Sequence, residues 1–223
     1  MGITQQSVAR RGAADDRAKP PQPSSRTSCT AGRSRISVSV ARTLSERRAA
    51  AELIRSRYAS RGYRVSAARA PTSAECTLIA AAAGATVGTL TLRLDGPDGL
   101  HADESYREEL DAARLAGRRV CELGRFAVAS DARSAPVLAA LFARAHAVVR
   151  ELSAVTDVFI EVNPRHADFY RKVFGFVVAA GERLCPRVLA PSVLLRLELE
   201  AFEARLQECA AALWPRRALL ALN

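Results

Sequence analysis

Apolar residues recur along this chain with the periods of short strands and amphipathic helices, beginning near residue 35. In the segment 35–41, Ile36, Val38 and Val40 alternate with other residues, as they would in a half-buried strand. We expect strands at 35–41, 76–83, 86–94, 119–128, 158–162, 176–180 and 193–199, and helices at 44–61, 103–115, 134–152, 164–174 and 200–213. This order predicts an α/β (α+β) fold with a mixed central sheet of about six to seven strands and helices on both faces.

The stretch from Val158 to Phe176 has the clearest local pattern. A β-branched and aromatic run is followed by Asn163 and Pro164, which suit the N-cap and first position of a helix. The helix then places Phe169, Tyr170, Val173 and Phe174 on one apolar face, and Gly175 suits a left-handed C-cap at its end. The stretch therefore predicts a strand, a sharp turn and a short helix.

Composition divides the chain into a tail and a folded part. Residues 1–33 are rich in Ser, Arg, Pro, Gln and Gly, so we expect a disordered tail there. We expect a single catalytic domain over 34–199, with a further helix at 200–223 packed on it. Residues 1–48 hold 10 basic and 3 acidic side chains, whereas 49–223 hold 23 and 20. Because the excess positive charge lies mainly in the tail, we expect no nucleic-acid partner.

The cysteines and the hydropathy suggest the compartment. Five cysteines are scattered without a CxxC pair, as is typical of thiols in a reducing cytoplasm. The three histidines are not spaced with them as metal ligands, so we expect no metal site. No uncharged apolar run reaches about 18 residues, so we expect no transmembrane segment.

Residues 122–126, Glu-Leu-Gly-Arg-Phe, place two opposite charges in an otherwise apolar strand. Strand alternation puts Glu122 and Arg125 on opposite faces unless a bulge at Gly124 brings them together. An unpaired buried charge is costly, so the two residues could form a structural ion pair. Alternatively, the two charges could belong to a catalytic site.

The strand–helix stretch resembles the C-terminal acyl-donor motif of the Gcn5-related N-acetyltransferase (GNAT) superfamily. The matching residues are Asn163, Ala167, Phe169, Tyr170, Gly175 and Phe176. The resemblance implies the acyl-CoA N-acyltransferase fold, in which two parallel strands separate to admit the pantetheine arm of the acyl donor.

Within that superfamily the chain is similar to autoinducer (acyl-homoserine-lactone) synthases and, more closely, to N-acyl amino acid synthases of the N-acyltyrosine type. Glu122, Gly124, Arg125 and Phe126 match a motif of the autoinducer enzymes, and the likeness covers most of residues 40–200. Arg57, Tyr58, Tyr63 and Arg93 match further positions of the two families. The resemblance implies transfer of a fatty acyl group from acyl carrier protein to the amine of an amino acid.

Two departures refine this expectation. Only Glu75 is acidic between Arg64 and Thr77, where autoinducer synthases carry acidic residues that hold S-adenosylmethionine. The loop 130–136 has no glycine, and Pro136 lacks a backbone N–H, unlike the loop that cradles pyrophosphate in acetyl-CoA enzymes. The donor is therefore expected to be acyl-4′-phosphopantetheine on acyl carrier protein, with acyl-CoA as the alternative and no tightly bound cofactor.

The resemblance and the chemistry assign roles to particular residues. Glu122 is the expected base, because an amine must lose a proton before it attacks a thioester. Tyr170, or His166 on the same helix, could protonate the departing thiolate. The expected acceptor-binding residues are Arg57, Arg93, Arg125 and Tyr63, and the expected donor-binding residues are Leu123, Gly124, Phe126, Arg133, Asn163 and Phe169.

Other interpretations stay open at this stage. Tyr170 could be a core aromatic residue, and the three arginines could be surface charges. The chain could instead be an acetyl-CoA-dependent N-acetyltransferase, an autoinducer synthase or a non-catalytic acyl-binding module.

Overall fold

A computed structural model describes residues 35–63, 74–132, 134–152 and 155–204 of the 223 residues. The expected tail at 1–33 and most of the expected helix at 200–213 lie outside the described residues. The described strands are β1 (Ser37–Val40), β2 (Glu75–Ala82), β3 (Ala85–Leu94), β4 (Val120–Val128), β5 (Asp157–Val162), β6 (Val177–Cys185) and β7 (Ala190–Glu198). The helices between these strands are α1 (Leu44–Ala59), α2 (Asp103–Leu115), α3 (Ser134–Leu152) and α4 (Pro164–Phe174).

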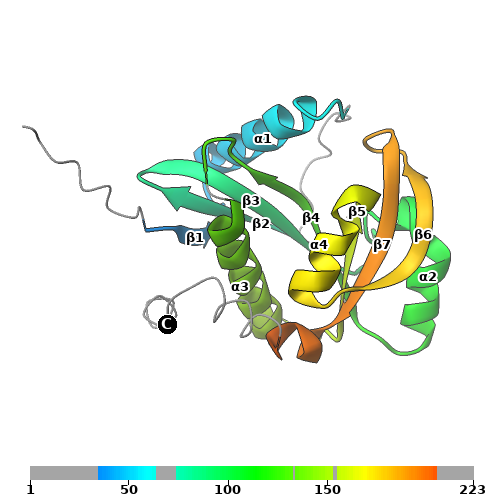
Figure 1. The fold of residues 1–223 in the computed structure, drawn as a ribbon. Coiled ribbons are helices and arrows are strands. Elements are labelled where there is room, and N and C mark those ends of the chain that lie inside the picture. Colours follow the sequence, from blue (N-terminus) through cyan, green and yellow to red (C-terminus); the bar gives the residue numbers. More distant parts are fainter. Residues whose placement is uncertain (1–34, 64–73, 133, 153–154, 205–223) are drawn as a thin grey trace, which may run out of the picture. The chain divides into compact units, whose positions relative to one another are not determined.

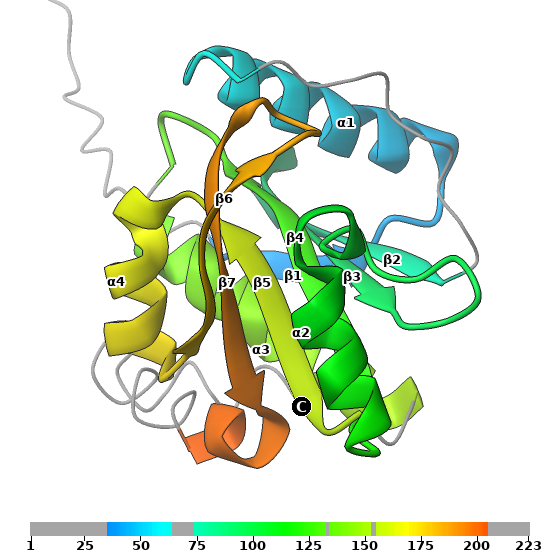
Figure 2. The same ribbon diagram turned by 90° about the vertical axis from the view of Figure 1, so that its right-hand side faces the viewer.

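The seven strands form one mixed sheet in the order β1-β2-β3-β4-β5-β7-β6. Only the β4–β5 pair is parallel among the described ladders, and the others are antiparallel. Helices α1 and α2 cover one face, while α3 and α4 cover the other (Figures 1 and 2). The predicted fold class is confirmed.

The local signals explain where the helices begin and end. Thr43 and Glu46 form a capping box at the start of α1, with each side chain bonded to the backbone of the other residue. At α4, the Asn163 side chain accepts a hydrogen bond from the backbone of Arg165, and Gly175 ends the helix at φ 81°. Both helices start where their capping residues predict.

The two faces of the sheet differ in chemistry. Toward α3 and α4 the strands present an apolar core that includes Leu78, Leu90, Leu123 and Ile160. Toward α1 and α2 the same strands present buried polar side chains as well, namely Thr89, Thr91, Arg93, Glu122 and Ser192. Buried polar groups need partners, so this second face is the place to look for a functional site.

The β6–β7 hairpin differs from the expectation. The strand expected at 176–180 extends to Cys185, and β7 starts at Ala190, which leaves only a short connection. β6 is an edge strand, and its second half carries Gly181, Glu182 and Arg183 instead of alternating apolar residues. Edge strands often carry such charges, and these conceal the strand period in the sequence.

Phe174 is the central side chain of the aromatic cluster beneath α4. Its ring is 1% exposed and stacks on Phe142 at 4.4 Å between centroids. Phe174→Ala should therefore lower the free energy of unfolding by roughly 3–5 kcal/mol, measured by chemical denaturation. Phe169→Ala is the matched control, because that side chain is 41% exposed, and it should cost less than about 1 kcal/mol. Equal losses in the two variants would contradict this assignment of the core.

Candidate active site

Strands β4 and β5 separate partway along their length. Their parallel ladder joins Val120 to Asp157, Cys121 to Val158 and Glu122 to Phe159, and it contains no later pair. Beyond Glu122 the backbone of β4 makes no further ladder pair with β5, while β5 stays paired with β7 as far as Val162 (Figure 2). The expected separation of two parallel strands is thus present in the fold.

A bulge in β4 then redirects its side chains. Thr91 pairs with Gly124 and Thr89 with Ala127, so β4 has one more residue than β3 between these pairs. Arg125 occupies the bulge with φ 48°, a left-handed conformation that is uncommon for a residue other than glycine. As a result Glu122 and Arg125 line the same cleft, instead of pointing to opposite faces.

This cleft has a volume of about 1280 Å³ and lies on the polar face of the sheet, beneath α1. Small apolar side chains of α1 and of the segment before it belong to its lining, among them Ala41, Ala50 and Ala51. The lining also includes charged and polar side chains, among them Glu75, Arg93, His101, Glu104, Glu122, Arg125, Glu161, Arg187 and Ser192.

Glu122 is 4% exposed and is held by backbone amides. Its Oε2 accepts hydrogen bonds from the amide of His101 at 2.6 Å and from that of Ala102 at 3.2 Å. Its Oε1 lies beside Gly124, 3.8 Å from where a β-carbon of that residue would be. Burial raises the pKa of Glu122, and the charge of Arg187 opposes that rise. A carboxylate with one anchored oxygen and a raised pKa suits a general base.

Glu75 is a second buried carboxylate in the cleft, and the side chains of two arginines and one histidine surround it. Its Oε1 lies 2.7 Å from Nη1 of Arg93 and 2.8 Å from Nε2 of His101, and its Oε2 lies 3.1 Å from Nη1 of Arg125. Burial opposes the ionisation of Glu75, but the hydrogen bonds and positive charges around it outweigh burial and lower its pKa to about 2. Arg125 therefore forms its ion pair with Glu75. The alternative drawn from the sequence, a structural ion pair between Glu122 and Arg125, is not what the structure contains.

A third cluster closes the cleft from the β6–β7 side. Arg187, in the turn between these strands, bonds the carboxylate of Glu161 and the carbonyl oxygen of His101. Ser192 donates to Oε1 of Glu161 at 2.7 Å, and the hydroxyl of Tyr106 donates to the carbonyl of Ser192 at 2.6 Å. These contacts connect the hairpin to the residue whose amide holds Glu122.

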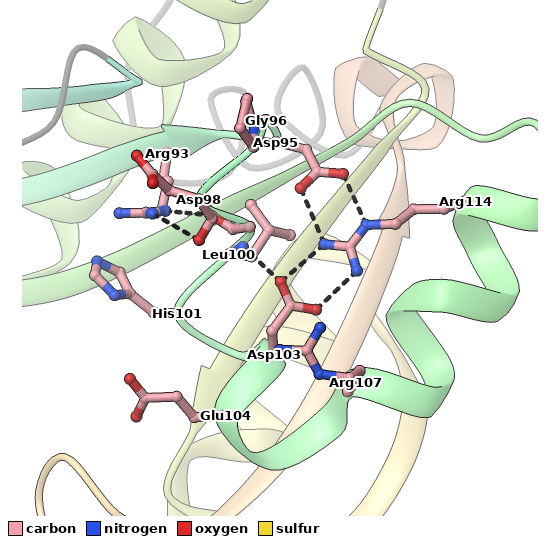
Figure 3. Close-up of a pocket in the computed structure, with 12 residues that line it drawn as sticks. Arg93, Asp95, Gly96, Asp98, Leu100, His101, Asp103, Glu104, Arg107 and Arg114 are labelled. Atoms are coloured by element: carbon pink, nitrogen blue, oxygen red, sulfur yellow. Dashed lines mark hydrogen bonds and ion pairs between the residues drawn. The ribbon is translucent and has the colours of Figure 1, made fainter.

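A smaller cavity of about 580 Å³ lies beside the start of α2. In it Arg114 bonds Asp95 at 2.8 and 2.9 Å and Asp103 at 2.7 and 2.9 Å (Figure 3). These ion pairs tie the first turn of α2 to the turn that follows β3. They therefore hold the segment before α2 in place, and with it the backbone amide of His101 that donates to Glu122. We assign these ion pairs a structural role.

Several of the expected site residues meet in the main cleft. Glu122, Gly124, Arg125, Arg93, Tyr63 and Asn163 all line it. The guanidinium of Arg93 is fully engaged, because Nε donates to the carbonyl of Gly99 at 2.7 Å and Nη2 to that of Asp98 at 3.3 Å. Its assignment to the acceptor carboxylate stays a prediction, although the geometry favours a role in positioning Glu75.

The residues at the mouth of the cleft contact one another. Tyr63 accepts a hydrogen bond at 3.0 Å from Arg165, whose guanidinium also lies 5.8 Å from the Tyr63 ring centre. Asn163 caps α4 through Oδ1 and donates from its amide to the carbonyl of Pro191 at 3.2 Å. These contacts join α1, α4 and the β7 hairpin.

Other expected residues lie outside the cleft lining. Leu123 is in the core, Phe126 packs against the core, and Phe169 is on the surface of α4 rather than on its buried face. Arg57 is half-buried, and its Nε has no hydrogen-bond partner among the described residues. Arg133 lies outside the described residues.

Tyr170 sits in the aromatic cluster and is 8% exposed, with the ring of Phe142 6.2 Å away. Burial raises its pKa, and the neighbouring Tyr58 adds to the rise. Tyr58 itself lines the cleft, and burial raises its pKa to about 12. The role of Tyr170 as an acid stays a prediction.

The sequence did not indicate four of the charged residues in the cleft. His101 was not among the expected site residues, but its side chain contacts Glu75 and its amide contacts Glu122. Glu161 lies within the apolar run of β5, and such a charge in a buried strand is a signal that could have been noticed. Nothing in the sequence around Glu75 indicated its contacts with Arg93, His101 and Arg125, and nothing around Arg187 indicated its contact with Glu161.

The described residues contain neither a cluster of metal ligands nor a membrane-spanning helix. Within the described ranges, no group of three or more His, Cys, Asp or Glu side chains could hold a metal ion. The same part of the chain contains no helix that is long and apolar enough to cross a membrane.

The sheet order, the separated β4 and β5 strands and the charged cleft define the chain as an N-acyltransferase of the Gcn5-related class. A sequence model of the N-acyl amino acid synthase FeeM matches residues 49–198. That span covers more than half of the chain, and the chain belongs to this family. No curated protein sequence matches it.

Solved structures agree with this assignment. The structure of FeeM, an N-acyl amino acid synthase from uncultured soil microbes, is 26% identical, with a TM-score of 0.71 over 78% of this chain and 95% of that one. A putative N-acetyltransferase from Lactobacillus plantarum is 17% identical, with a TM-score of 0.56 over 74% and 98%. The acyl-homoserine-lactone synthase LasI is 15% identical, with a TM-score of 0.56 over 78% and 96%. The last two likenesses concern the fold alone.

Proposed function

We propose that this N-acyltransferase joins a fatty acyl group, carried as a thioester on acyl carrier protein, to the amine of an amino acid. The observation that carries the proposal is the placement of Glu122. Its Oε2 is anchored by two amides, and its Oε1 faces the cleft beside Gly124, where β4 and β5 separate. An amine bound in the cleft would therefore meet a base next to the gap through which the thioester enters.

In this mechanism each part of β4 has its own task. Glu122 accepts a proton from the amine of the amino acid. The amine then attacks the thioester carbonyl, and N–H groups of β4 after Glu122, which lie outside the ladder with β5, stabilise the oxyanion. Arg125 is 30% exposed and is our candidate for binding the acceptor carboxylate.

Tyr170 enters the mechanism as a hydrogen-bond donor to the leaving sulfur. Its pKa is raised above the usual value near 10, whereas a thiol has a pKa near 8.5. Full proton transfer from Tyr170 to the thiolate is thus unfavourable, so a hydrogen bond is the contribution that fits its pKa.

The carrier-protein donor is supported by the segment that leads into α3. The described part of this loop has no glycine, and Pro136, in the first turn of α3, has no N–H to offer a pyrophosphate. The three cysteines of the described ranges, Cys76, Cys121 and Cys185, are free thiols, which suits a cytoplasmic location, where we also place the reaction.

The proposal can be tested by one assay. The purified protein is incubated with acyl carrier proteins charged at several chain lengths and with all amino acids pooled, and the products are identified by mass spectrometry. We expect N-acyl amino acids whose mass depends on the acyl chain supplied. The absence of any N-acylated product, with either carrier-protein or CoA donors, would overturn the proposal.

The donor prediction concerns kcat/KM for one acyl group on two carriers. Acyl carrier protein should be the better donor, because the loop before α3 lacks the groups that would bind the pyrophosphate of CoA. Unacylated holo-carrier protein should compete with the acylated form, and free CoA should not. An equal or higher kcat/KM with acyl-CoA would refute the carrier-protein assignment while leaving the transferase activity intact.

A further inference from the structure

His101 is in contact with four of the charged side chains that line the cleft, namely Glu122, Arg187, Glu75 and Arg125. Its amide donates to Glu122 at 2.6 Å, and its carbonyl oxygen accepts from Arg187. Its ring nitrogen Nε2 lies 2.8 Å from Glu75 and 3.3 Å from Nη2 of Arg125. The imidazole is 16% exposed and lines the cleft, so it is open to a bound ligand.

The contact with Glu75 determines which ring nitrogen can accept a proton. The Glu75 carboxylate, with a pKa of about 2, is ionised and can only accept hydrogen bonds. Its 2.8 Å contact is the shorter of the two at Nε2 and assigns the hydrogen of His101 to that nitrogen, so the 3.3 Å approach of the Arg125 guanidinium, which can only donate, is not a hydrogen bond in this tautomer. The lone pair then belongs to Nδ1, for which no hydrogen-bond partner lies among the described residues. A histidine whose tautomer is fixed by a buried carboxylate is arranged as a base.

The chemistry of the proposed reaction needs two proton acceptors. The amine nitrogen begins as an ammonium group and ends as an amide N–H, so it loses two protons. One proton must leave before the N–C bond forms, and the second leaves the tetrahedral intermediate when the C–S bond breaks. The departing thiolate takes up one of these protons, and the other passes to solvent.

We propose that His101, through Nδ1, is a second proton acceptor that works beside Glu122 in this reaction. The inference depends on the proposed transfer to an amine. The imidazole belongs to the residue whose own amide contacts Glu122, so the two bases are neighbours on one wall of the cleft. Figure 3 shows the His101 ring beside Arg93 and on the side away from Arg114.

Charged side chains of several elements line the cleft together with His101. They are Arg47 and Arg55 of α1, Glu75 of β2, Arg93 of β3, Glu122 and Arg125 of β4, Glu104 of α2, Glu161 of β5 and Arg187 of the β6–β7 turn. Carboxylates and guanidinium groups are thus mixed around the imidazole.

Two variants separate the base from its structural contact. His101→Gln keeps an N–H donor at the position of Nε2 for Glu75 but has no basic nitrogen. His101→Ala removes both and leaves a space the size of the ring. We expect kcat to fall by about 10²-fold in both variants, with the melting temperature of His101→Gln close to that of the wild type. Full activity in His101→Gln would overturn the proposal.

Chemical rescue gives a measurement that a purely structural role would not affect. Added imidazole should restore activity to His101→Ala, and more basic methylimidazoles should restore more. In Glu122→Gln the ring of His101 still occupies its place, so added imidazole should not restore activity to that variant. Rescue that does not depend on basicity, or no rescue at all, would contradict proton transfer. If the wild type forms no N-acyl amino acid, the proposed function itself fails, which is a different result.

Discussion

Glu122→Gln should leave the protein folded and lower kcat by about 10²- to 10⁴-fold, the usual effect of removing a positioned base. The amide oxygen of Gln can still accept the hydrogen bonds from His101 and Ala102 that hold the carboxylate. Burial raises the pKa of Glu122, which means that its negative charge is costly in the folded state. A neutral side chain of the same shape should therefore melt at the same temperature or higher.

The pH dependence follows from the same raised pKa. A base must be ionised, so the wild-type rate should fall as the pH drops through the pKa of Glu122, at a higher pH than for an ordinary glutamate with pKa 4.5. The contribution of Glu122 to folding stability changes with pH in the opposite direction to that of a carboxylate in an ion pair, whose pKa is lowered. Because the folded state binds this proton more tightly, Glu122 favours the folded state at low pH, and its contribution declines as the pH rises through the raised pKa.

The comparison with the variant gives the decisive measurement. In Glu122→Gln the loss of rate should shrink at high pH, where more of the acceptor amine is already neutral. A variant that melts many degrees early, yet turns over normally per folded molecule, would end the catalytic assignment. That result would mean that Glu122 serves mainly to hold the backbone at His101.

The fold could be predicted because its signals are local. The period of apolar residues located the strands, and Asn163, Pro164 and Gly175 set both ends of α4 through their own backbone preferences. The prediction was wrong where that period is absent. The end of β6 was missed because an edge strand need not alternate, and Phe169 was assigned to the buried face of α4 although its ring is 41% exposed.

The site was only partly predictable because its contacts span long distances along the chain. Glu122 and Arg125 could be chosen as unusual charges in an apolar strand, but only the backbone of the bulge shows that they share a cleft. Glu75 and His101 are 26 positions apart and meet because β2 pairs with β3 and the chain then turns into α2. No periodicity in one sequence reports such a pairing.

Glu75→Gln should lower the free energy of unfolding by roughly 3–5 kcal/mol at neutral pH, since it removes one partner of a buried ion pair. The side chains of Glu75 and Arg93 are 3% and 4% exposed, so water cannot replace the lost charge. The amide oxygen of Gln could accept from only one of the two arginines, because they bond different oxygens of Glu75, and the NH₂ group would face the donor of the other. The exposed pair of Glu52 and Arg55 offers the matched control, and Glu52→Gln should cost less than about 0.5 kcal/mol.

Acid titration shows whether the charge of Glu75 is the cause. Its pKa is lowered from 4.5 to about 2, so the stabilisation is fully present above pH 4.5 and is lost as the pH falls toward 2. Urea unfolding at several pH values should therefore show the wild type and Glu75→Gln far apart at pH 7 and converging near pH 2, while Glu52→Gln stays close to the wild type throughout. A gap between wild type and Glu75→Gln that is independent of pH would mean that shape, and not charge, makes Glu75 necessary. Equal stability at pH 7 would show that Arg93 and Arg125 are sufficiently paired without it.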